Sequence, residues 1–270
     1  MTEETETGKK HGFKLIQMIY VIIVLVAVIV AVFMIMSALS GNSKITQVGN
    51  GWNAVTASQP FTVGNSLYVT FIGIEGCKFC AAERYAVFAA LGNFGNWTFN
   101  GKPVTLSTLN ISNLSSEPQP YTLFYQANEG GWTINFLAKN LVYSSKLVAF
   151  SSVETLNNYN NPLQTPNAIQ TAYINKYDAV GSVPFTVIGG NFFEIGAGSS
   201  LVPGGIPITL SNGGMTPTEM ISGYNTNGSA VNLAITTEAN YITAIICHDI
   251  SNSAAACSIP VVNSIEKTLN

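Results

Sequence analysis

The feature that most constrains this chain is a run of twenty-five residues without a charged side chain, from Leu15 to Leu39. An α-helix of this length spans about 37 Å, which is enough to cross a hydrocarbon core of about 30 Å with some tilt. The run therefore predicts one N-terminal transmembrane helix at residues 15–39, preceded by a short tail at residues 1–14.

The charges that flank this run predict its orientation. Lys9, Lys10 and Lys14 precede it, whereas only Lys44 follows closely. Positive charges favour the cytoplasmic side of a membrane helix. We therefore expect a single-pass protein of the cell membrane, with a cytoplasmic N-terminus and an extracellular C-terminal domain.

Two alternatives concern processing of the N-terminal segment. Ala38-Leu39-Ser40 has the small-x-small pattern of a signal-peptidase site, but the apolar run exceeds the roughly 7–15 residues usual for a signal-peptide core. Gly12 before the long apolar run resembles archaeal pilin-type leaders, and Lys14 argues against that alternative. An uncleaved anchor is the preferred interpretation.

The chain has 4 cysteines, and all of them follow the membrane segment. An even number of cysteines in an oxidising compartment indicates two disulfides. Their spacing selects Cys77–Cys80 and Cys247–Cys257 from the alternative pairings. We expect the second bond to be structural and to join two helices near the C-terminus, at Glu238–Ile246 and Ile259–Leu269.

The motif Cys77-Lys78-Phe79-Cys80 lies between a strand-like run, Leu67 to Ile74, and a helix-like run, Ala81 to Leu91. At the start of a helix the first sulfur lies beside unpaired backbone N–H groups and the positive end of the helix dipole, which lowers the pKa of the thiol. The thiolate is the form that attacks disulfides. This context predicts a redox-active dithiol.

A zinc site is the main alternative for this motif. Structural zinc needs four ligands, and the other candidates, Cys247, His248, Cys257 and His11, contain no second close cysteine pair. We therefore predict no metal, and the sequence gives no sign of an organic cofactor.

A second motif follows about a hundred residues later, where Val183-Pro184 precedes two β-prone runs separated by Gly189-Gly190-Asn191. Glycine and asparagine accept positive φ, so this pattern predicts a β-hairpin. A proline directly before a strand is also a position where a cis peptide is found.

Together the two motifs resemble the thioredoxin superfamily, and more closely its DsbA-like disulfide oxidoreductases because of the long segment between the motifs. The chain also resembles an uncharacterised group of archaeal membrane-anchored thioredoxin-like proteins. The resemblance covers roughly Phe61 to Glu266. It implies an α/β fold, with a linker at 40–60, a thioredoxin-like domain at 61–270 and a long insertion at about 115–180.

The resemblance also implies roles for individual residues. Cys77 would be the exposed nucleophile and Cys80 the resolving thiol. Val183 and Pro184 would face the dithiol and bind an extended substrate segment like an added strand. The implied function is a membrane-anchored extracytoplasmic thiol-disulfide oxidoreductase acting on protein thiols or disulfides.

The sequence departs from that family at the position of a buried acidic residue, six residues before the first cysteine, where it has Phe71. Glu75 is the nearest carboxylate in the sequence and is our candidate for proton handling. The alternative for Glu75 is a solvated charge at the end of a strand.

A different class of function is a surface-exposed thioredoxin-like binding or structural module, in which a Cys77–Cys80 disulfide is inert. Nucleic-acid binding is not expected, because charged residues make up only 9% of the chain and its formal net charge is −3.

Four N-glycosylation sequons agree with an external location, and they place candidate acceptors at Asn96, Asn110, Asn113 and Asn227. Their alternative interpretation is ordinary polar loops. Further elements are expected from local patterns, namely a strand at Val104–Ile111, a helix at Pro166–Tyr177 capped by Thr165, and a helix at Thr216–Tyr224.

Overall fold

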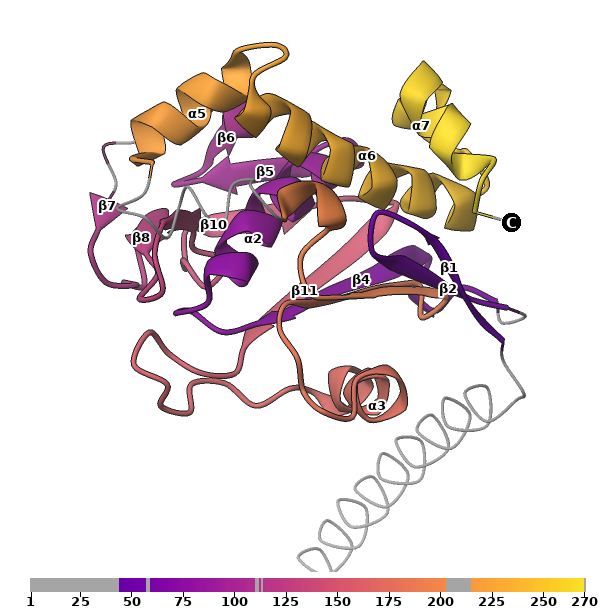
Figure 1. Cartoon of the computed structure of the whole chain (residues 1–270), viewed down its shortest axis with the longest axis horizontal. Coiled ribbons are helices and arrows are strands. Elements are labelled where there is room, and N and C mark those ends of the chain that lie inside the picture. Colours follow the sequence, from indigo (N-terminus) through magenta and orange to yellow (C-terminus); the bar gives the residue numbers. More distant parts are fainter. Residues whose placement is uncertain (1–43, 57–58, 110–111, 113, 203–214, 270) are drawn as a thin grey trace, which may run out of the picture. The chain divides into compact units, whose positions relative to one another are not determined.

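The computed structural model describes residues 44–269 except 57–58, 110–111, 113 and 203–214. The predicted tail and transmembrane helix, at 1–14 and 15–39, lie outside the described residues. Residues 44–270 form one compact unit. In its described part this unit is a mixed α/β fold with five α-helices and three β-sheets (Figure 1).

The largest sheet has seven strands, and β4 (Ser66–Gly73) is an internal strand of it, next to the edge strand β11 (Val148–Glu154). Strand β4 pairs in parallel with β11 and antiparallel with β12 (Phe185–Ile188). Beyond β12 the order continues antiparallel through β13 (Phe192–Ile195), β2 (Trp52–Val55) and β1 (Ile45–Gly49), and the short β3 (Thr62–Val63) pairs with the start of β4.

Strand β4 is buried from Leu67 to Gly73, as predicted for a central strand covered on both faces. Helices α2 (Lys78–Leu91) and α6 (Ala230–Asp249) cover one face, and α3 (Ala168–Tyr177) covers the other (Figure 1). Successive residues of a strand point to opposite faces. Accordingly, the hydroxyl of Thr70 accepts a hydrogen bond from Gln170 of α3, at 3.0 Å, while the ring of Phe71 faces α2.

Two smaller three-stranded sheets pack against the side of α2. The first comprises β10 (Leu141–Ser144), β5 (Asn96–Phe99) and β6 (Lys102–Val104), and the second comprises β7 (Leu114–Ser115), β8 (Phe124–Gln126) and β9 (Trp132–Ile134). The Trp97 indole donates a hydrogen bond to the Phe88 carbonyl at 3.0 Å, and the Thr133 hydroxyl donates one to the Ala81 carbonyl at 3.0 Å. The two contacts hold α2 at both ends.

The prediction of a strand at Val104–Ile111 is wrong. Strand β6 ends at Val104, and a 3₁₀ helix, η1 (Leu106–Thr108), follows. The Thr108 hydroxyl accepts a hydrogen bond from the backbone N–H of Thr105 at 2.9 Å, which favours the turn over an extended chain. The parallel partner of β4 is instead β11, much later in the chain.

The expected boundaries of the insertion and the linker also differ from the structure. Strand β11 and helix α3 lie within the expected insertion at about 115–180, yet both belong to the main sheet and its covering layer. Strands β1 and β2 lie within the expected linker at 40–60, so the folded unit begins at Lys44. Trp52 on β2 is fully buried.

The hairpin of β12 and β13 is confirmed. Gly189 and Gly190 have φ values of 57° and 71° in the connection between the strands. The Val183–Pro184 peptide just before β12 is cis.

The C-terminal part is helical, as expected. Helix α5 (Pro217–Asn225) has Thr216 as its N-cap, as predicted, and α7 (Pro260–Glu266) ends the described chain. At α3 the cap is Asn167 and not Thr165, because the Asn167 side chain accepts hydrogen bonds from the backbone N–H groups of Ile169 and Gln170. Among the described residues α6 is long and apolar enough to cross a membrane, but 61% of its apolar window is buried within the domain.

Candidate functional site

The candidate site lies at the N-terminal end of α2, where Cys77 is the N-cap residue. Its sulfur accepts a hydrogen bond from the backbone N–H of Cys80 at 3.2 Å. Both cysteines are free thiols, so the Cys77–Cys80 disulfide expected from the spacing is not formed in this structure. Cys80 is fully buried, and Cys77 is only 4% exposed, so the expectation of an exposed first cysteine is wrong: the Val183 loop lies against it and Glu129 covers the start of α2. The local fold thus places the first sulfur against the unpaired N–H groups of the helix, as the sequence predicted.

The environment separates the pKa values of the two thiols. A hydrogen bond from the Cys80 thiol is the main cause that lowers the pKa of Cys77; burial opposes it, and the Cys80 backbone N–H and Arg84 add to the lowering. Burial raises the pKa of Cys80 well above its ordinary value. Cys77 is therefore the thiol of the pair that loses its proton first.

The loop before β12 faces this dithiol. The carbonyl oxygen of Val183 lies 4.0 Å from the sulfur of Cys77, within reach of its weak S–H donor. Val183 is half-buried and Pro184 is buried. The fold therefore brings together Cys77, Cys80 and Val183, three residues that the sequence assigned to one site, whereas contact of Pro184 with the dithiol stays a prediction.

A buried ion pair lies behind the cysteines, one helical turn beyond Cys80. The Arg84 guanidinium donates two hydrogen bonds to the Glu154 carboxylate, at 3.0 and 2.8 Å, and a third to the Ile74 carbonyl at 2.9 Å. The two side chains are 0% and 2% exposed. Burial lowers the pKa of Arg84, but Glu154 outweighs that effect and raises it, so Arg84 keeps its charge.

The pair lies beside Phe71, the residue at the position where an acidic side chain was expected. The Arg84 guanidinium lies 5.5 Å from the centre of the Phe71 ring and 5.7 Å from that of Tyr125. An acidic residue is present near Cys80 after all, but it is Glu154, and it comes from the neighbouring strand β11. Glu154 is among the charges that raise the pKa of Cys80, and Arg84 lowers it.

Glu75 is 7% exposed, so the alternative of a solvated strand-end charge is wrong. Its carboxylate accepts a hydrogen bond from the backbone N–H of Asn158 at 3.0 Å, and its carbonyl accepts one from the Tyr125 hydroxyl at 3.1 Å. Burial is the main cause that raises the pKa of Glu75. Its role in proton handling stays a prediction.

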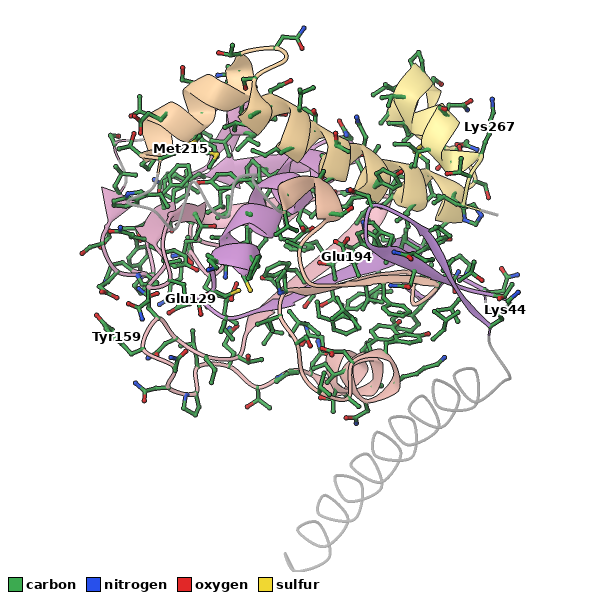
Figure 2. All side chains as sticks on the ribbon, in the orientation of Figure 1. Lys44, Glu129, Tyr159, Glu194, Met215 and Lys267 are labelled. Carbon is green, nitrogen blue, oxygen red and sulfur yellow. A yellow bond between two sulfur atoms is a disulfide. The ribbon has the colours of Figure 1, made fainter. Side chains whose placement is uncertain are left out.

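The segment around residue 129 also contacts the start of α2. Glu129, labelled beside α2 in Figure 2, accepts a hydrogen bond from the backbone N–H of Lys78 at 3.4 Å. Its negative charge opposes the lowering of the Cys77 pKa. Lys78 and Phe79, the residues between the cysteines, are both half-buried.

Cys247 and Cys257 form a disulfide, with their Cα atoms 5.5 Å apart, as predicted. It joins the end of α6 to the 3₁₀ helix η3 (Ala255–Ser258), just before α7. Because both sulfurs are bonded to each other, they are not available as zinc ligands for Cys77 and Cys80.

The four candidate glycosylation sites divide into two groups. Asn96, at the start of β5, and Asn227, between α5 and α6, are exposed. Asn110 and Asn113 lie outside the described residues.

Sequence analysis did not identify Arg84 and Glu154. It also missed a group of three buried carboxyl side chains that could hold a metal ion, Glu83, Glu194 and Glu238. A usable signal was available in the composition. Only 9% of the residues are charged, so a charge within an apolar segment, such as Glu83-Arg84 in the alanine-rich helix, is conspicuous.

Comparison with known proteins gives one match. A family model described as a domain of unknown function, DUF929, matches residues 53–248, from β2 to the end of α6. The matched region includes both the cysteine motif and the hairpin motif. No curated protein and no solved structure matches the chain.

Proposed function

Because the chain belongs to the DUF929 family, whose function is unknown, its activity has to be inferred from its own residues, and we propose that it is a membrane-anchored extracytoplasmic thiol-disulfide oxidoreductase. The observation that carries this proposal is the position of Cys77. It caps α2, receives hydrogen bonds from Cys80, has a lowered pKa and lies opposite Val183. These are the properties of an attacking thiol.

The proposal includes a thioredoxin-like fold. Strand β4, helix α2 and the parallel strand β11 form a βαβ unit, and the Cys-x-x-Cys motif lies where β4 passes into α2. A Cys-x-x-Cys motif near a βαβ unit is typical of thioredoxin-like redox proteins. The hairpin of β12 and β13 beside β4 supports the same assignment.

The proposed reaction is a two-step exchange. The Cys77 thiolate attacks one sulfur of a substrate disulfide, which forms a mixed disulfide and releases the other substrate sulfur as a thiolate. Cys80 then loses its proton and attacks Cys77, which releases the second substrate thiolate and leaves a Cys77–Cys80 disulfide. The substrate gains two electrons; the reverse sequence oxidises a substrate dithiol.

In this scheme Arg84 and Glu154 are positioning residues. Arg84 favours the thiolate of both cysteines, whereas Glu154 disfavours that of Cys80. Burial and the neighbouring Cys77 are what keep Cys80 protonated until a mixed disulfide has formed, and the Arg84–Glu154 pair makes smaller, opposing contributions. A charged pair thus replaces the single acidic residue that the family resemblance leads one to expect at Phe71.

The location is part of the proposal. The apolar run at 15–39 would anchor the chain in the cell membrane with the domain outside, and the exposed Asn96 and Asn227 would be open to glycosylation. The structural disulfide Cys247–Cys257 agrees with an oxidising compartment.

The test is insulin reduction and dithiol oxidation by the full chain in a mild detergent, together with its reduction potential. We expect turnover in wild type and none in Cys77→Ser. The burial of both thiols favours the alternative, a binding or structural module with an inert disulfide. A potential below about −300 mV with no exchange by wild type would establish that alternative.

A further inference from the structure

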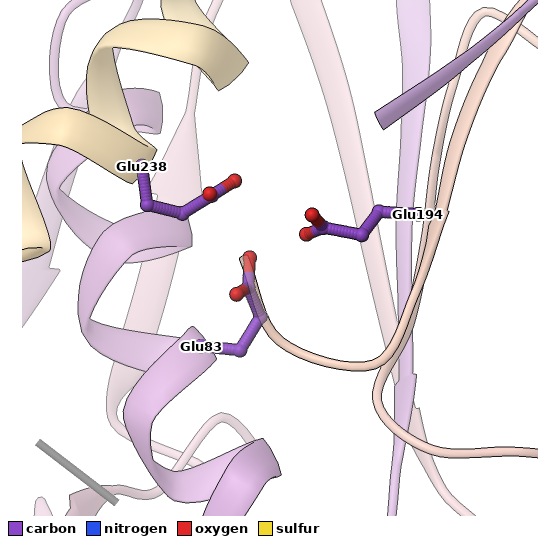
Figure 3. A group of neighbouring side chains, drawn as sticks. All are labelled: Glu83, Glu194 and Glu238. Atoms are coloured by element: carbon purple, nitrogen blue, oxygen red, sulfur yellow. The ribbon is translucent and has the colours of Figure 1, made fainter. Parts of the chain in front are cut away.

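Three glutamate side chains from three different elements meet inside the domain. Glu83 belongs to α2, Glu194 to β13 and Glu238 to α6, and each is fully buried. Their carboxyl groups point toward one another (Figure 3), and one oxygen from each lies within 4.8 Å of the others.

The cluster contains oxygens without hydrogen-bond partners. Both carboxyl oxygens of Glu194 and one of Glu83 are buried and unpartnered. Among the described residues no ion pair reaches any of the three glutamates. Glu194 is therefore a buried polar side chain, aimed at two further carboxyl groups, that none of the residues the structure describes satisfies.

The surrounding groups orient the carboxyls from the outside. Glu238 accepts hydrogen bonds from the Trp52 indole, at 2.8 Å, and from the Asn50 side chain. Glu83 accepts one from the backbone N–H of Gly198 at 3.2 Å. A side chain at Gly51 or Gly198 would collide with Glu194 or Glu238, so the backbone closes the cluster from solvent.

We propose that Glu83, Glu194 and Glu238 bind one divalent cation of the oxygen-preferring class, with Ca²⁺ as the best fit. Calcium takes oxygen ligands at about 2.3–2.6 Å in a flexible shell, so any two of its ligands lie no more than about 5.2 Å apart. The three carboxyl oxygens, all within 4.8 Å of one another, meet that condition. Magnesium demands near-ideal octahedral geometry and usually keeps several waters, which an enclosed cluster of three carboxyl groups does not favour.

The cation would have a structural role that does not depend on the proposed redox function. It would join α2, β13 and α6, which together carry the cysteine helix, the hairpin and the core of the C-terminal part. Since the site is enclosed, the ion would enter as the chain folds. The competing occupant is protons, because burial raises the pKa of all three carboxyl groups, that of Glu83 to about 7.

Metal content is the first test. The full chain is purified in mild detergent, unfolded in guanidinium chloride with EDTA, and refolded with Ca²⁺, Mg²⁺, Mn²⁺ or no divalent ion. We expect one equivalent of Ca²⁺ per chain after dialysis and a thermal midpoint several degrees higher than without it. Refolding to the same midpoint in all four solutions, or an absence of bound metal in wild type purified in Ca²⁺, would overturn the proposal.

Terbium is the second test, because Trp52 donates a hydrogen bond to a proposed ligand and would sensitise Tb³⁺ luminescence. We expect at least a tenfold loss of this signal in Glu194→Gln and in Trp52→Phe. Glu219→Gln, at an exposed glutamate that caps α5, serves as the matched control and should keep the signal.

An equal loss in Glu219→Gln would identify the signal as surface binding and overturn the proposal. If Glu194→Gln does not fold, the metal content of wild type decides alone. If instead it is more stable than wild type in every solution, the cluster holds protons and not a cation.

Discussion

Glu83 and Arg84 are neighbours on the same helix and both are fully buried, yet their surroundings are opposite. Arg84 meets Glu154, and the pair is stabilised by two direct hydrogen bonds. Glu83 meets two more carboxyl groups and no positive charge among the described residues. The Arg84 side of the helix, which we call the balanced side, lies with the cysteines, whereas the Glu83 side, the unbalanced side, meets no counter-charge within the described part of the chain.

The largest expected effect is the loss of thiol-disulfide exchange, which should leave the carboxyl cluster on the other side of α2 unchanged. Cys77→Ser should reduce thiol-disulfide exchange to the uncatalysed rate, because a serine hydroxyl is not ionised at neutral pH and cannot form a disulfide. Its cation-dependent thermal midpoint should equal that of wild type. Residual exchange would show that Cys77 is not the nucleophile.

The next largest effect is expected when the Arg84–Glu154 ion pair on the balanced side is broken. Arg84→Met should lower the free energy of unfolding by about 3–5 kcal/mol, since it leaves the Glu154 carboxylate buried without a counter-charge. Chemical denaturation measures this, with or without Ca²⁺. The double variant Arg84→Met with Glu154→Leu should recover most of the loss, and a single-variant loss below about 1 kcal/mol would contradict our account of the pair.

A smaller effect is expected on the unbalanced side, at the carboxyl cluster, and its sign should depend on whether Ca²⁺ is present. In EDTA, Glu83→Gln should raise the free energy of unfolding by about 1 kcal/mol, because it removes one of three buried carboxyls. In Ca²⁺ the same substitution should lower the free energy of unfolding, because the cation loses one of its ligands. The same sign in both solutions would argue against a cation, whereas Glu219→Gln, which alters only the cap of α5, should change the free energy of unfolding by the same amount in both solutions.

The smallest effect concerns the pKa of Cys77, measured from the pH dependence of iodoacetamide alkylation. In wild type the midpoint should lie below the roughly 8.5 of a free thiol, since the lowered pKa means more thiolate at neutral pH. Cys80→Ala removes the main donor and should shift the midpoint upward. Cys80→Ser retains a donor and should shift it less; no shift in either variant would exclude this hydrogen bond as the cause.

Local patterns carried the successful predictions. The junction of β4 and α2, the glycine hairpin at Gly189–Gly190 and the Cys247–Cys257 disulfide each depend on residues close together in the sequence. The predicted partner loop at Val183 is the exception, and it was found through a family resemblance.

Most features that were not predicted depend on residues far apart in the sequence. Others depend on a turn whose composition is the same as that of a flexible linker. Glu154 reaches Arg84 across 70 residues, and no local pattern indicates that β11 pairs with β4. Strands β1 and β2 were missed because Gly49, Asn50 and Gly51, which make the turn between them, also occur in flexible linkers. The carboxyl cluster combines both difficulties, because its three residues come from α2, β13 and α6.

The Cys247–Cys257 disulfide determines how many electrons the folded chain can exchange. Cys247 lies in the last turn of α6 and Cys257 in η3, so neither sulfur sits at the start of a long helix as Cys77 does, where a thiolate leaving group is favoured. The bond should therefore resist a mild reductant. The folded chain would then exchange two electrons, at Cys77 and Cys80, while the other two stay locked in the scaffold. A thiol titration should count two reactive groups after mild reduction and four only after unfolding in reductant.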